Sequence, residues 1–377
     1  MPKLLLIVAG EASGDHHGAR LLRELRNQVP GLIVYGLGGE RMREQGVELV
    51  ADVSAISVIG LAEVARVLPE ARKIFKTLVA RVKVDPPDVA VLIDFPEFNL
   101  RLAPALRKLG VKVVYYVSPQ VWAWRRGRVK SMARSIDRML VLFPFEEVFY
   151  RGRLEVSHVG HPLVDEVPIR PQVWDSGSEP GPIRIVLLPG SRSSEVKRLL
   201  PVLLETAQRL EKDRPDMKVT LIEAATLDSK EADRMIGDSG LEVERVAEAD
   251  RFDAIASAHL ALCASGTATL EVGLLRTPMI VVYRVGLFSY WLGRMIVKVP
   301  FISLVNLVLG RAVVPELIQK EAEARKIGAE ALDILNNSAR RETMRSALGE
   351  LRPALGTSGA SARAASEVAV FLGGGAV

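Results

Sequence analysis

Residues 4–28 read LLLIVAGEASGDHHGARLLRELRNQ, an aliphatic run that passes through a short small-residue loop into an amphipathic segment. The run Leu4–Val8 is typical of a strand inside a parallel sheet, where both faces are covered and apolar residues do not need to alternate with polar ones. Gly18–Gln28 has the apolar spacing of a helix. A strand that leads through a glycine loop into a helix is the unit from which parallel α/β sheets are built.

The same unit recurs through the first half of the chain. Four more compact aliphatic runs are predicted to be buried strands: Leu32–Gly36, Val89–Asp94, Val111–Val117 and Met139–Phe143. Helical patterns lie between them, at Glu63–Lys83 (with a break expected near Pro69), Leu100–Leu109 and Lys130–Ser135. This alternation predicts a parallel sheet covered by helices.

A change of composition separates the two halves. Asp165–Arg184 is rich in Pro, Gly and Ser with little periodicity, and we interpret it as a linker. After it the pattern restarts, with predicted strands Ile183–Leu188, Lys218–Ile222, Leu260–Ala264 and Met279–Tyr283 and a helix Glu195–Leu210. The expected fold class is α/β, with two doubly wound parallel-sheet (Rossmann-like) domains facing a cleft. We expect them at 1–167 and 183–349, with a C-terminal helix within 350–377 that can pack back on the first domain.

Composition narrows the class of protein. The 377 residues are 49% hydrophobic and 25% charged, which excludes wholesale disorder. The single cysteine, Cys263, excludes an internal disulfide and a Cys-based zinc site, and it fits a reducing cytoplasm. A net charge of +5 favours anionic partners without choosing among phosphates, nucleic acid and acidic lipids.

The chain's apolar stretches do not predict a leader or a membrane span. The apolar opening is followed at once by Glu11 and Asp15 and has no cleavage signal, so a first strand explains it better than a signal peptide. The longest apolar-rich stretch, Gly286–Gly310, is interrupted by Lys298 and Pro300.

The loop Gly10–Asp15 is the first candidate site. Its glycines allow a ligand to approach the backbone, but their spacing is not that of the dinucleotide fingerprint. Two acidic side chains would repel a phosphate, so hydroxyl groups or a sugar suit the loop better. An ordinary tight turn is the alternative interpretation.

Asp94 is the candidate general base. It ends a predicted strand, and ligands of open α/β sheets lie beyond the carboxyl ends of strands. The neighbouring Phe95 and Phe98 would raise the pKa of its carboxyl by desolvation. Equally, an Asp close to a Pro often only caps a turn.

Two segments combine apolar and basic residues. Tyr115–Arg125 holds two of the four tryptophans and leads into the strongly basic Arg125–Arg138, a pattern that fits nucleic acid, a phosphorylated amphiphile, or a buried aromatic pair followed by a solvated helix. Arg66–Lys83 is a basic amphipathic stretch, either interfacial or core-facing. The large side chains that favour the interfacial interpretation are Phe288, Tyr290, Trp291, Leu292, Ile296, Phe301, Leu304 and Leu307.

Two loops in the second half are candidate phosphate sites. Leu188–Arg192 precedes a helix, and Arg192 could pair bidentately with a phosphate. Ser265–Glu271 repeats the arrangement after another strand, where backbone N–H groups could hold a diphosphate and Glu271 the ribose hydroxyls. Neither loop is a Walker motif. No metal site is predicted, because His158 and His161 have no obvious third ligand.

Taken together, these motifs resemble the lipid-A-disaccharide synthase family, bacterial enzymes of the two-domain glycosyltransferase-B architecture. One position departs from the family pattern: Val305 stands where a Pro usually precedes the Asn. The matching segments run in family order over nearly the whole chain: Gly10–Asp15, Asp94–Asn99, Tyr116–Arg125, Phe143–Glu146, Val159–Pro162, Leu188–Arg192, Ser265–Glu271 and Pro315–Gln319.

The resemblance implies an inverting, metal-independent transfer of 2,3-diacylglucosamine from its UDP conjugate to the 6-hydroxyl of 2,3-diacylglucosamine 1-phosphate (lipid X). Asp94 would be the catalytic base, with Arg192 and Ser265–Ala268 stabilising the departing diphosphate. No cofactor and no nucleic acid are expected, the expected location is the cytoplasmic face of the inner membrane, and a homodimer is an open option. Expected substrate contacts are Glu11, Ser13, Asp15, Asn99, Ser118, Gln120, Trp122, Arg125 and Asn306. Expected nucleotide contacts are Gly190, Ser191, Arg192, Ser265, Gly266, Thr267, Ala268, Glu271, Glu316 and Gln319.

Two other classes of function stay open at this point. One is another UDP-sugar enzyme of the same architecture, such as a 2-epimerase or a lipid-linked GlcNAc transferase. The other is a non-catalytic module that binds anionic lipid or RNA through the basic segments.

Overall fold

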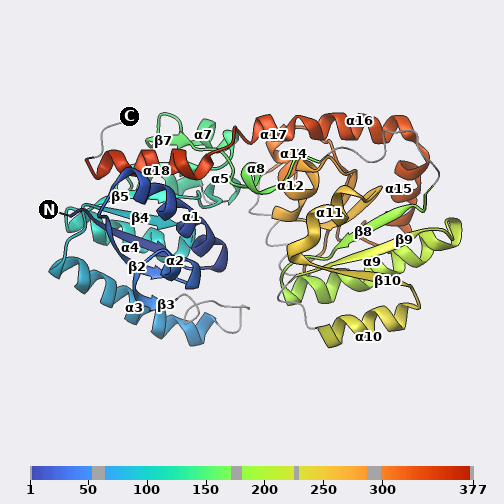
Figure 1. Ribbon diagram of the computed structural model, residues 1–377, viewed down its shortest axis with the longest axis horizontal. Coiled ribbons are helices and arrows are strands. Elements are labelled where there is room, and N and C mark those ends of the chain that lie inside the picture. The colour runs from blue at the N-terminus through green and yellow to red at the C-terminus, as the bar shows by residue number, and fades with distance from the viewer. Residues whose placement is uncertain are drawn as a thin grey trace. The chain divides into compact units, whose positions relative to one another are not determined.

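The computed structural model describes residues 2–52, 64–124, 126–170, 181–224, 229–286 and 299–373. Contacts between residues divide the chain into two compact units (Figure 1). The N-terminal unit comprises Met1–Pro162 with Gly356–Val377, and the C-terminal unit comprises Leu163–Leu355. Each unit is built on one parallel sheet.

The sheet of the N-terminal unit has seven strands in the order β3-β2-β1-β4-β5-β6-β7, and neighbouring strands pair in parallel. The central strands β1 and β4 are buried except for Leu4, which explains their unbroken aliphatic sequences. The strands are β1 (Leu4–Ala9), β2 (Ile33–Gly38), β3 (Glu48–Asp52), β4 (Val89–Ile93), β5 (Lys112–Tyr116), β6 (Arg138–Val141) and β7 (Val156–His158).

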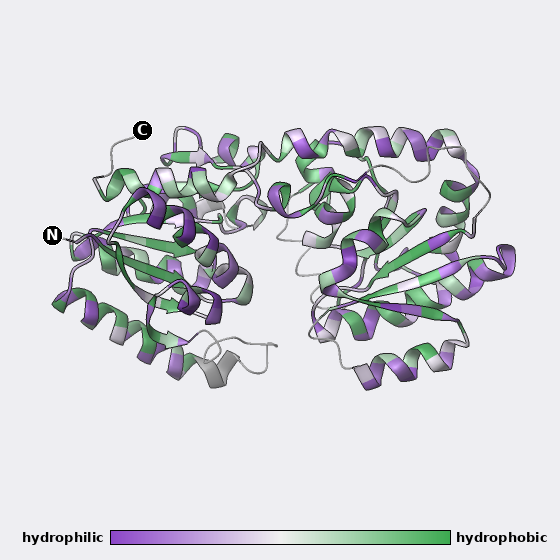
Figure 2. Ribbon diagram, viewed as in Figure 1, coloured by the Kyte–Doolittle hydropathy of each residue, from purple (hydrophilic) through white to green (hydrophobic). Residues whose placement is uncertain are grey.

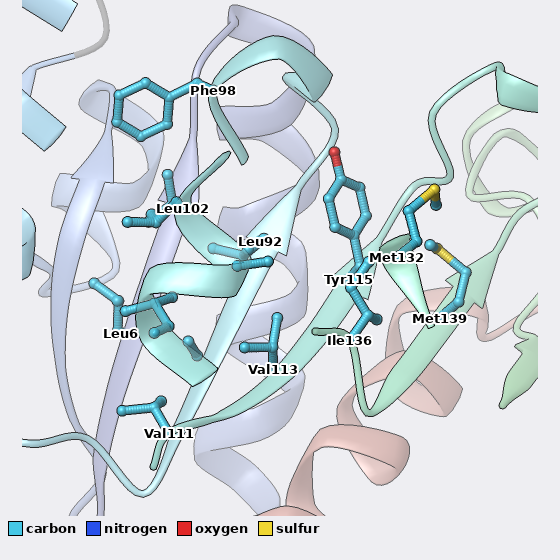
Figure 3. Close-up of a cluster of buried hydrophobic side chains, with 14 of the residues drawn as sticks. Leu6, Leu92, Phe98, Leu102, Val111, Val113, Tyr115, Met132, Ile136 and Met139 are labelled. Carbon is cyan, nitrogen blue, oxygen red and sulfur yellow. The ribbon is translucent and has the colours of Figure 1, made fainter. Parts of the chain in front are cut away.

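Helices cover both faces of this sheet. Successive residues of β1 alternate between two cores: Leu6 and Val8 pack with the helices on one face, and Leu5 and Ile7 with those on the other. Figure 3 shows part of the first core, and Figure 2 shows the central strands as continuously hydrophobic. The helices are α1 (Ala12–Gln28), α2 (Glu40–Glu44), α3 (Val64–Val84), α4 (Pro96–Lys108), α5 (Val121–Trp124), α6 (Val129–Met132), α7 (Pro144–Tyr150) and α18 (Ala360–Phe371).

The last helix of the chain belongs to the N-terminal unit. Helix α18 lies beside α1, and Ala364, Ala365 and Val368 are buried in the same core as Leu21 and Leu25 (Figure 1). Small residues along α18 allow the two helices to approach closely.

The C-terminal unit repeats the design with a six-stranded parallel sheet, in the order β10-β9-β8-β11-β12-β13. Its strands are β8 (Arg184–Leu188), β9 (Lys218–Glu223), β10 (Val243–Ala247), β11 (Leu260–Ala264), β12 (Met279–Tyr283) and β13 (Glu316–Ile318). Its helices are α8 (Leu163–Glu166), α9 (Ser193–Asp213), α10 (Ser229–Ser239), α11 (Arg251–Ala256), α12 (Thr267–Leu274), α14 (Leu304–Leu309), α15 (Ala324–Asn336), α16 (Ser338–Gly349) and α17 (Leu351–Ala354).

The predicted fold class, two doubly wound parallel α/β sheets, is confirmed, and three local expectations are corrected. Helix α3 runs through Pro69 without a break, because Pro69 lies near the helix start, where its missing N–H removes only one hydrogen bond. Helix α1 begins at Ala12, so Ser13 and Asp15 are helical and the loop after β1 is only Gly10-Glu11. Helix α4 begins at Pro96, directly after the β4 loop.

Candidate active site

The loop that follows β4 has an unusual backbone. Asp94 and Phe95 both have positive φ, 45° and 48°, although neither is glycine. Each such residue costs about 1–3 kcal/mol, and such strain is found mainly at functional sites. The Phe95 ring packs over Gly10 at the end of β1, where a Cβ atom would lie 2.1 Å from the ring. Gly10 is therefore required for this loop to close.

The carboxyl group of Asp94 is poised to act as a base. Burial raises its pKa from 3.8 to about 6, and the negative charge of Glu11 is the second-largest cause of this rise. A hydrogen bond from the Phe95 backbone opposes the shift. A carboxylate with this pKa is ionised at neutral pH and is a stronger proton acceptor than an ordinary Asp.

Asp94 lies on a pocket of about 200 Å³ with a mixed polar and apolar lining, at the carboxyl edge of β4 and β5. An ion pair between Arg128 and Glu97 (3.1 Å) and the amide of Gln120 add hydrogen-bonding groups to its wall. A hydroxyl-bearing ligand suits such a lining. The lining residues are Asp94, Pro96, Glu97, Pro119, Gln120, Val121 and Arg128.

Two of the predicted substrate contacts in this unit have internal hydrogen-bond partners. The carboxylate of Asp15 accepts the backbone N–H groups of Gly39 (2.7 Å), Arg41 (3.1 Å) and Met42 (3.1 Å), so it holds the start of α2. Asn99 is completely buried, and its Nδ2 donates to the carbonyl oxygens of Ile93 and Asp94. Both side chains are buried, and Asn99 holds the backbone at Asp94.

Ser118 and Trp122, two further predicted substrate contacts, are also buried. The Ser118 hydroxyl hydrogen-bonds the Tyr150 hydroxyl (2.8 Å), and Trp122 Nε1 donates to Glu146 Oε1 (3.0 Å). Glu11, Ser13 and Gln120 are solvent-exposed. Arg125 lies outside the described residues, as do the predicted apolar side chains from Phe288 to Ile296.

Glu146 is a polar residue to which sequence reasoning gave no role. It is fully buried, and desolvation raises its pKa to about 8 against the hydrogen bonds from Phe143 N–H and Trp122. These two bonds tie the loop after β5 to the loop after β6. The signal in the sequence is the Glu at the third position of a helix that begins with Pro144, the pattern of a capping box.

In the C-terminal unit, the loop after β8 presents an exposed arginine. Gly190 has φ 107°, a conformation that favours glycine, and Arg192 is the N-cap of α9. The Arg192 side chain is 73% exposed, and its Nη1 donates to Glu195 Oε1 at 2.8 Å. Ser191 is also exposed. A guanidinium at a helix N-terminus is well suited to bind a phosphate.

The loop after β11 is the second glycine turn of this unit. Gly266 has φ 153° and open space where a Cβ would be, and α12 begins at the exposed Thr267. The first N–H groups of a helix have no partner within it and carry its positive dipole end, with Ala268 in this first turn. Ser265 is tied down, because its Oγ donates to the Ile302 carbonyl.

The predicted nucleotide contact Glu271 has a strong internal partner. Both of its carboxylate oxygens accept from Arg251, Oε2 from Nε at 2.8 Å and Oε1 from Nη2 at 2.9 Å. This bidentate ion pair is mostly buried.

Asn306, Glu316 and Gln319, three residues expected to contact substrate or nucleotide, have internal hydrogen-bond partners. Asn306 is 1% exposed and donates through Nδ2 to Val314 and Glu316 while its Oδ1 accepts two backbone N–H groups. Glu316 accepts the N–H groups of Ile302 and Ser303, and the Gln319 amide pairs with both backbone groups of Val285. Val305, where the family has Pro, is buried in α14.

The described residues hold neither a metal-binding cluster nor a membrane-spanning helix. They contain no cluster of three or more His, Cys, Asp or Glu placed to hold a metal ion. None of their helices is both long and apolar enough to cross a bilayer.

Solved structures define the class. The glycotransferase of kitacinnamycin is similar with a TM-score of 0.63 and 17% identity, covering 98% of this chain and 99% of that one. The UDP-GlcNAc 2-epimerase of Neisseria meningitidis, solved with UDP-GlcNAc, has a TM-score of 0.59 and 11% identity over 94% and 98%. The two parallel-sheet units are thus those of the glycosyltransferase-B fold.

The sequence itself identifies the family. The family model described as lipid-A-disaccharide synthetase matches residues 5–368. The lipid-A-disaccharide synthase of Myxococcus xanthus is 44% identical over 384 residues, covering 100% of this chain and 99% of that protein. This chain belongs to the lipid-A-disaccharide synthase family, and it is a glycosyltransferase.

Proposed function

We propose that this enzyme transfers 2,3-diacylglucosamine from UDP to the 6-hydroxyl of 2,3-diacylglucosamine 1-phosphate, giving the β-1,6-linked disaccharide 1-phosphate and UDP. The observation that carries the mechanism is the partly buried Asp94 carboxyl, with its pKa raised to about 6, on a pocket at the carboxyl edge of the sheet. Family membership supports the identity of the two substrates.

In the proposed reaction, Asp94 accepts the proton of the acceptor hydroxyl. The freed oxygen forms a bond to the anomeric carbon of the donor from the face opposite UDP, and the bond from that carbon to the phosphate oxygen breaks. The electron pair leaves with UDP, the anomeric configuration inverts, and the proton remains on Asp94 until solvent removes it.

The departing diphosphate is assigned to the C-terminal unit. Arg192 and the first turn of α12 supply positive charge where negative charge develops, which is commonly a large part of catalysis. A diphosphate carries more charge than the Glu195 carboxylate, so it would replace Glu195 as the partner of Arg192. Glu271 contacts ribose only if the Arg251 pair leaves an oxygen lone pair available.

Contact with the cytoplasmic face of the inner membrane is part of the proposal. Helix α3 exposes Arg72, Lys73, Lys76 and Lys83 together with the apolar Val84, which is 75% exposed. A row of cations with apolar side chains is attracted to anionic lipid headgroups. Substrates that carry two acyl chains each would lie in the lipid bilayer to which this helix surface binds.

The proposed reaction is tested by mass spectrometry of products. Purified protein is incubated with UDP-2,3-diacylglucosamine and lipid X, with and without a metal chelator. We expect a disaccharide 1-phosphate and an equal amount of UDP in both samples, and no UDP release without lipid X. Consumption of the UDP-sugar without lipid X, or its epimerisation, would favour the 2-epimerase alternative.

A further inference from the structure

The carbonyl oxygen of Asp94 is held by two side chains. The Tyr115 hydroxyl donates to it at 2.5 Å and Asn99 Nδ2 at 2.9 Å, while the Asp94 N–H donates to the Tyr116 carbonyl at 2.9 Å. Both polar groups of this residue's backbone are therefore fixed. Since the backbone here is in the left-handed region, the peptide would otherwise be free to relax to an ordinary turn.

The two donors have little freedom to move. The Tyr115 ring is completely buried and lies with Leu92, Val113 and Met132 in the core, its hydroxyl pointing away from Val113 (Figure 3). Moving that hydroxyl would require the core to repack.

The orientation of the Asn99 side chain is fixed by its donors. Asn99 Nδ2 bridges the Ile93 and Asp94 carbonyls, whereas its buried Oδ1 accepts no hydrogen bond from the described residues. A flipped amide would turn Oδ1 toward two carbonyl oxygens, which is unfavourable. The Asn99 side chain is therefore oriented so that Nδ2 binds the Asp94 backbone, although Oδ1 then has no hydrogen-bond partner among the described residues.

We propose that Tyr115 and Asn99 are positioning residues for catalysis: together they hold the Asp94 backbone in its left-handed conformation and so aim the carboxylate into the pocket. The inference rests on the proposed function, because it assumes that Asp94 is the base. It goes beyond that function in assigning a catalytic consequence to two buried side chains that donate hydrogen bonds to the Asp94 backbone.

The chain provides a matched control. The Tyr35 hydroxyl donates to the Asp85 backbone carbonyl at 2.9 Å, and Tyr35 is also a buried residue of the same sheet. Its hydrogen bond lies near the start of β4, at the opposite edge from Asp94. Tyr35→Phe therefore removes the same kind of bond without touching the Asp94 loop.

The test compares Tyr115→Phe and Tyr35→Phe in disaccharide formation, with Asp94→Asn as a third variant. We expect Tyr115→Phe to lower kcat by about 10- to 100-fold with KM for both substrates nearly unchanged, since small misplacements of a reacting group have effects of this size. Tyr35→Phe should keep kcat within about twofold while losing similar thermal stability. In Tyr115→Phe the acidic limb of the kcat profile should also move to lower pH, because a released Asp94 regains solvent.

The outcomes separate the two proposals. Equal kcat values and equal pH profiles for the two tyrosine variants would overturn the positioning role, and an inactive Asp94→Asn would then leave the proposed function standing. A nearly active Asp94→Asn would instead remove Asp94 as the base. If Tyr115→Phe does not fold, Asn99→Leu, which removes the other donor at similar volume, decides by the same readouts: unchanged kcat overturns the inference.

Discussion

The loops after β4 and β11 occupy equivalent places in two sheets of the same order, yet they are built in opposite ways. The β4 loop puts two non-glycine residues, Asp94 and Phe95, at positive φ and partly buries a carboxyl group. The β11 loop uses Gly266, which has no Cβ to strain, and ends in an exposed helix N-terminus. Strain is present where a side chain is needed at the turn, and glycine suffices where only backbone N–H groups are needed.

The two units also differ in the charge that they place at the loops after their strands. In the N-terminal unit, burial and Glu11 keep Asp94 ready to take up a proton. In the C-terminal unit, Arg192 and a helix dipole provide positive charge. As we propose, one architecture thus provides a base in one unit and an anion site in the other.

Asp94→Asn would test the base directly and has the largest expected effect. Turnover should fall by about 10²- to 10⁴-fold, since Asn cannot accept the proton. UDP binding should be unchanged, because we assign it to the other unit. Product formation by mass spectrometry and UDP titration by calorimetry measure the two quantities, and near-normal turnover would contradict the assignment.

Arg192→Ala tests the opposite half of the comparison. Both UDP affinity and turnover should fall, turnover by about 10- to 10³-fold, because the arginine would bind the diphosphate before and during its departure. Arg209→Ala is a suitable control, since Arg209 forms a similar exposed pair with Glu205 within α9. Unchanged UDP affinity in Arg192→Ala would place the diphosphate elsewhere.

The partly buried Asp94 carboxyl should also reduce the stability of the fold. The pKa of Asp94 is about 6 in the folded protein, against 3.8 for an ordinary Asp. As the pH rises from 4 to 6, the carboxyl therefore ionises in the unfolded chain before it ionises in the folded one, and the free energy of unfolding falls. Asp94→Asn should therefore be more stable than the wild type at pH 8, by at most about 3 kcal/mol, and this gain should vanish near pH 4. Urea unfolding at both pH values measures it, and an equal difference at both would exclude a titration effect.

Glu11→Gln gives the smallest expected effect. Removing this negative charge lowers the pKa of Asp94, so the acidic limb of the rate profile should move to lower pH by less than about one unit. The rate at pH 8 should hardly change, because Asp94 is ionised there in both proteins. A limb that stays in place would mean that burial alone sets the pKa.

The fold was predictable where strands are fully buried. The aliphatic runs of β1, β4, β8 and β11 gave their positions almost to the residue. The four edge strands β3, β7, β10 and β13 were not predicted, because they are short, half-buried and of mixed composition. Edge strands lack the continuous apolar pattern that marks central ones.

The residues of the candidate site were predictable where they come just after the end of a predicted strand. Asp94 directly follows β4, Gly190 and Gly266 come just after β8 and β11, and each sheet brings the residues after its strands to its carboxyl edge. Asn306 and Asn99 were not predictable as structural residues, because their partners are backbone groups that only the folded chain brings near. A buried amide and an exposed one look alike in sequence.

The most direct test of the central claim is the pH dependence of single-turnover disaccharide formation with both substrates saturating. If Asp94 takes the acceptor proton, the rate should rise tenfold per pH unit below about pH 6 and become constant above it. A rate that does not change between pH 4.5 and 8, in protein that remains folded throughout, would contradict the account.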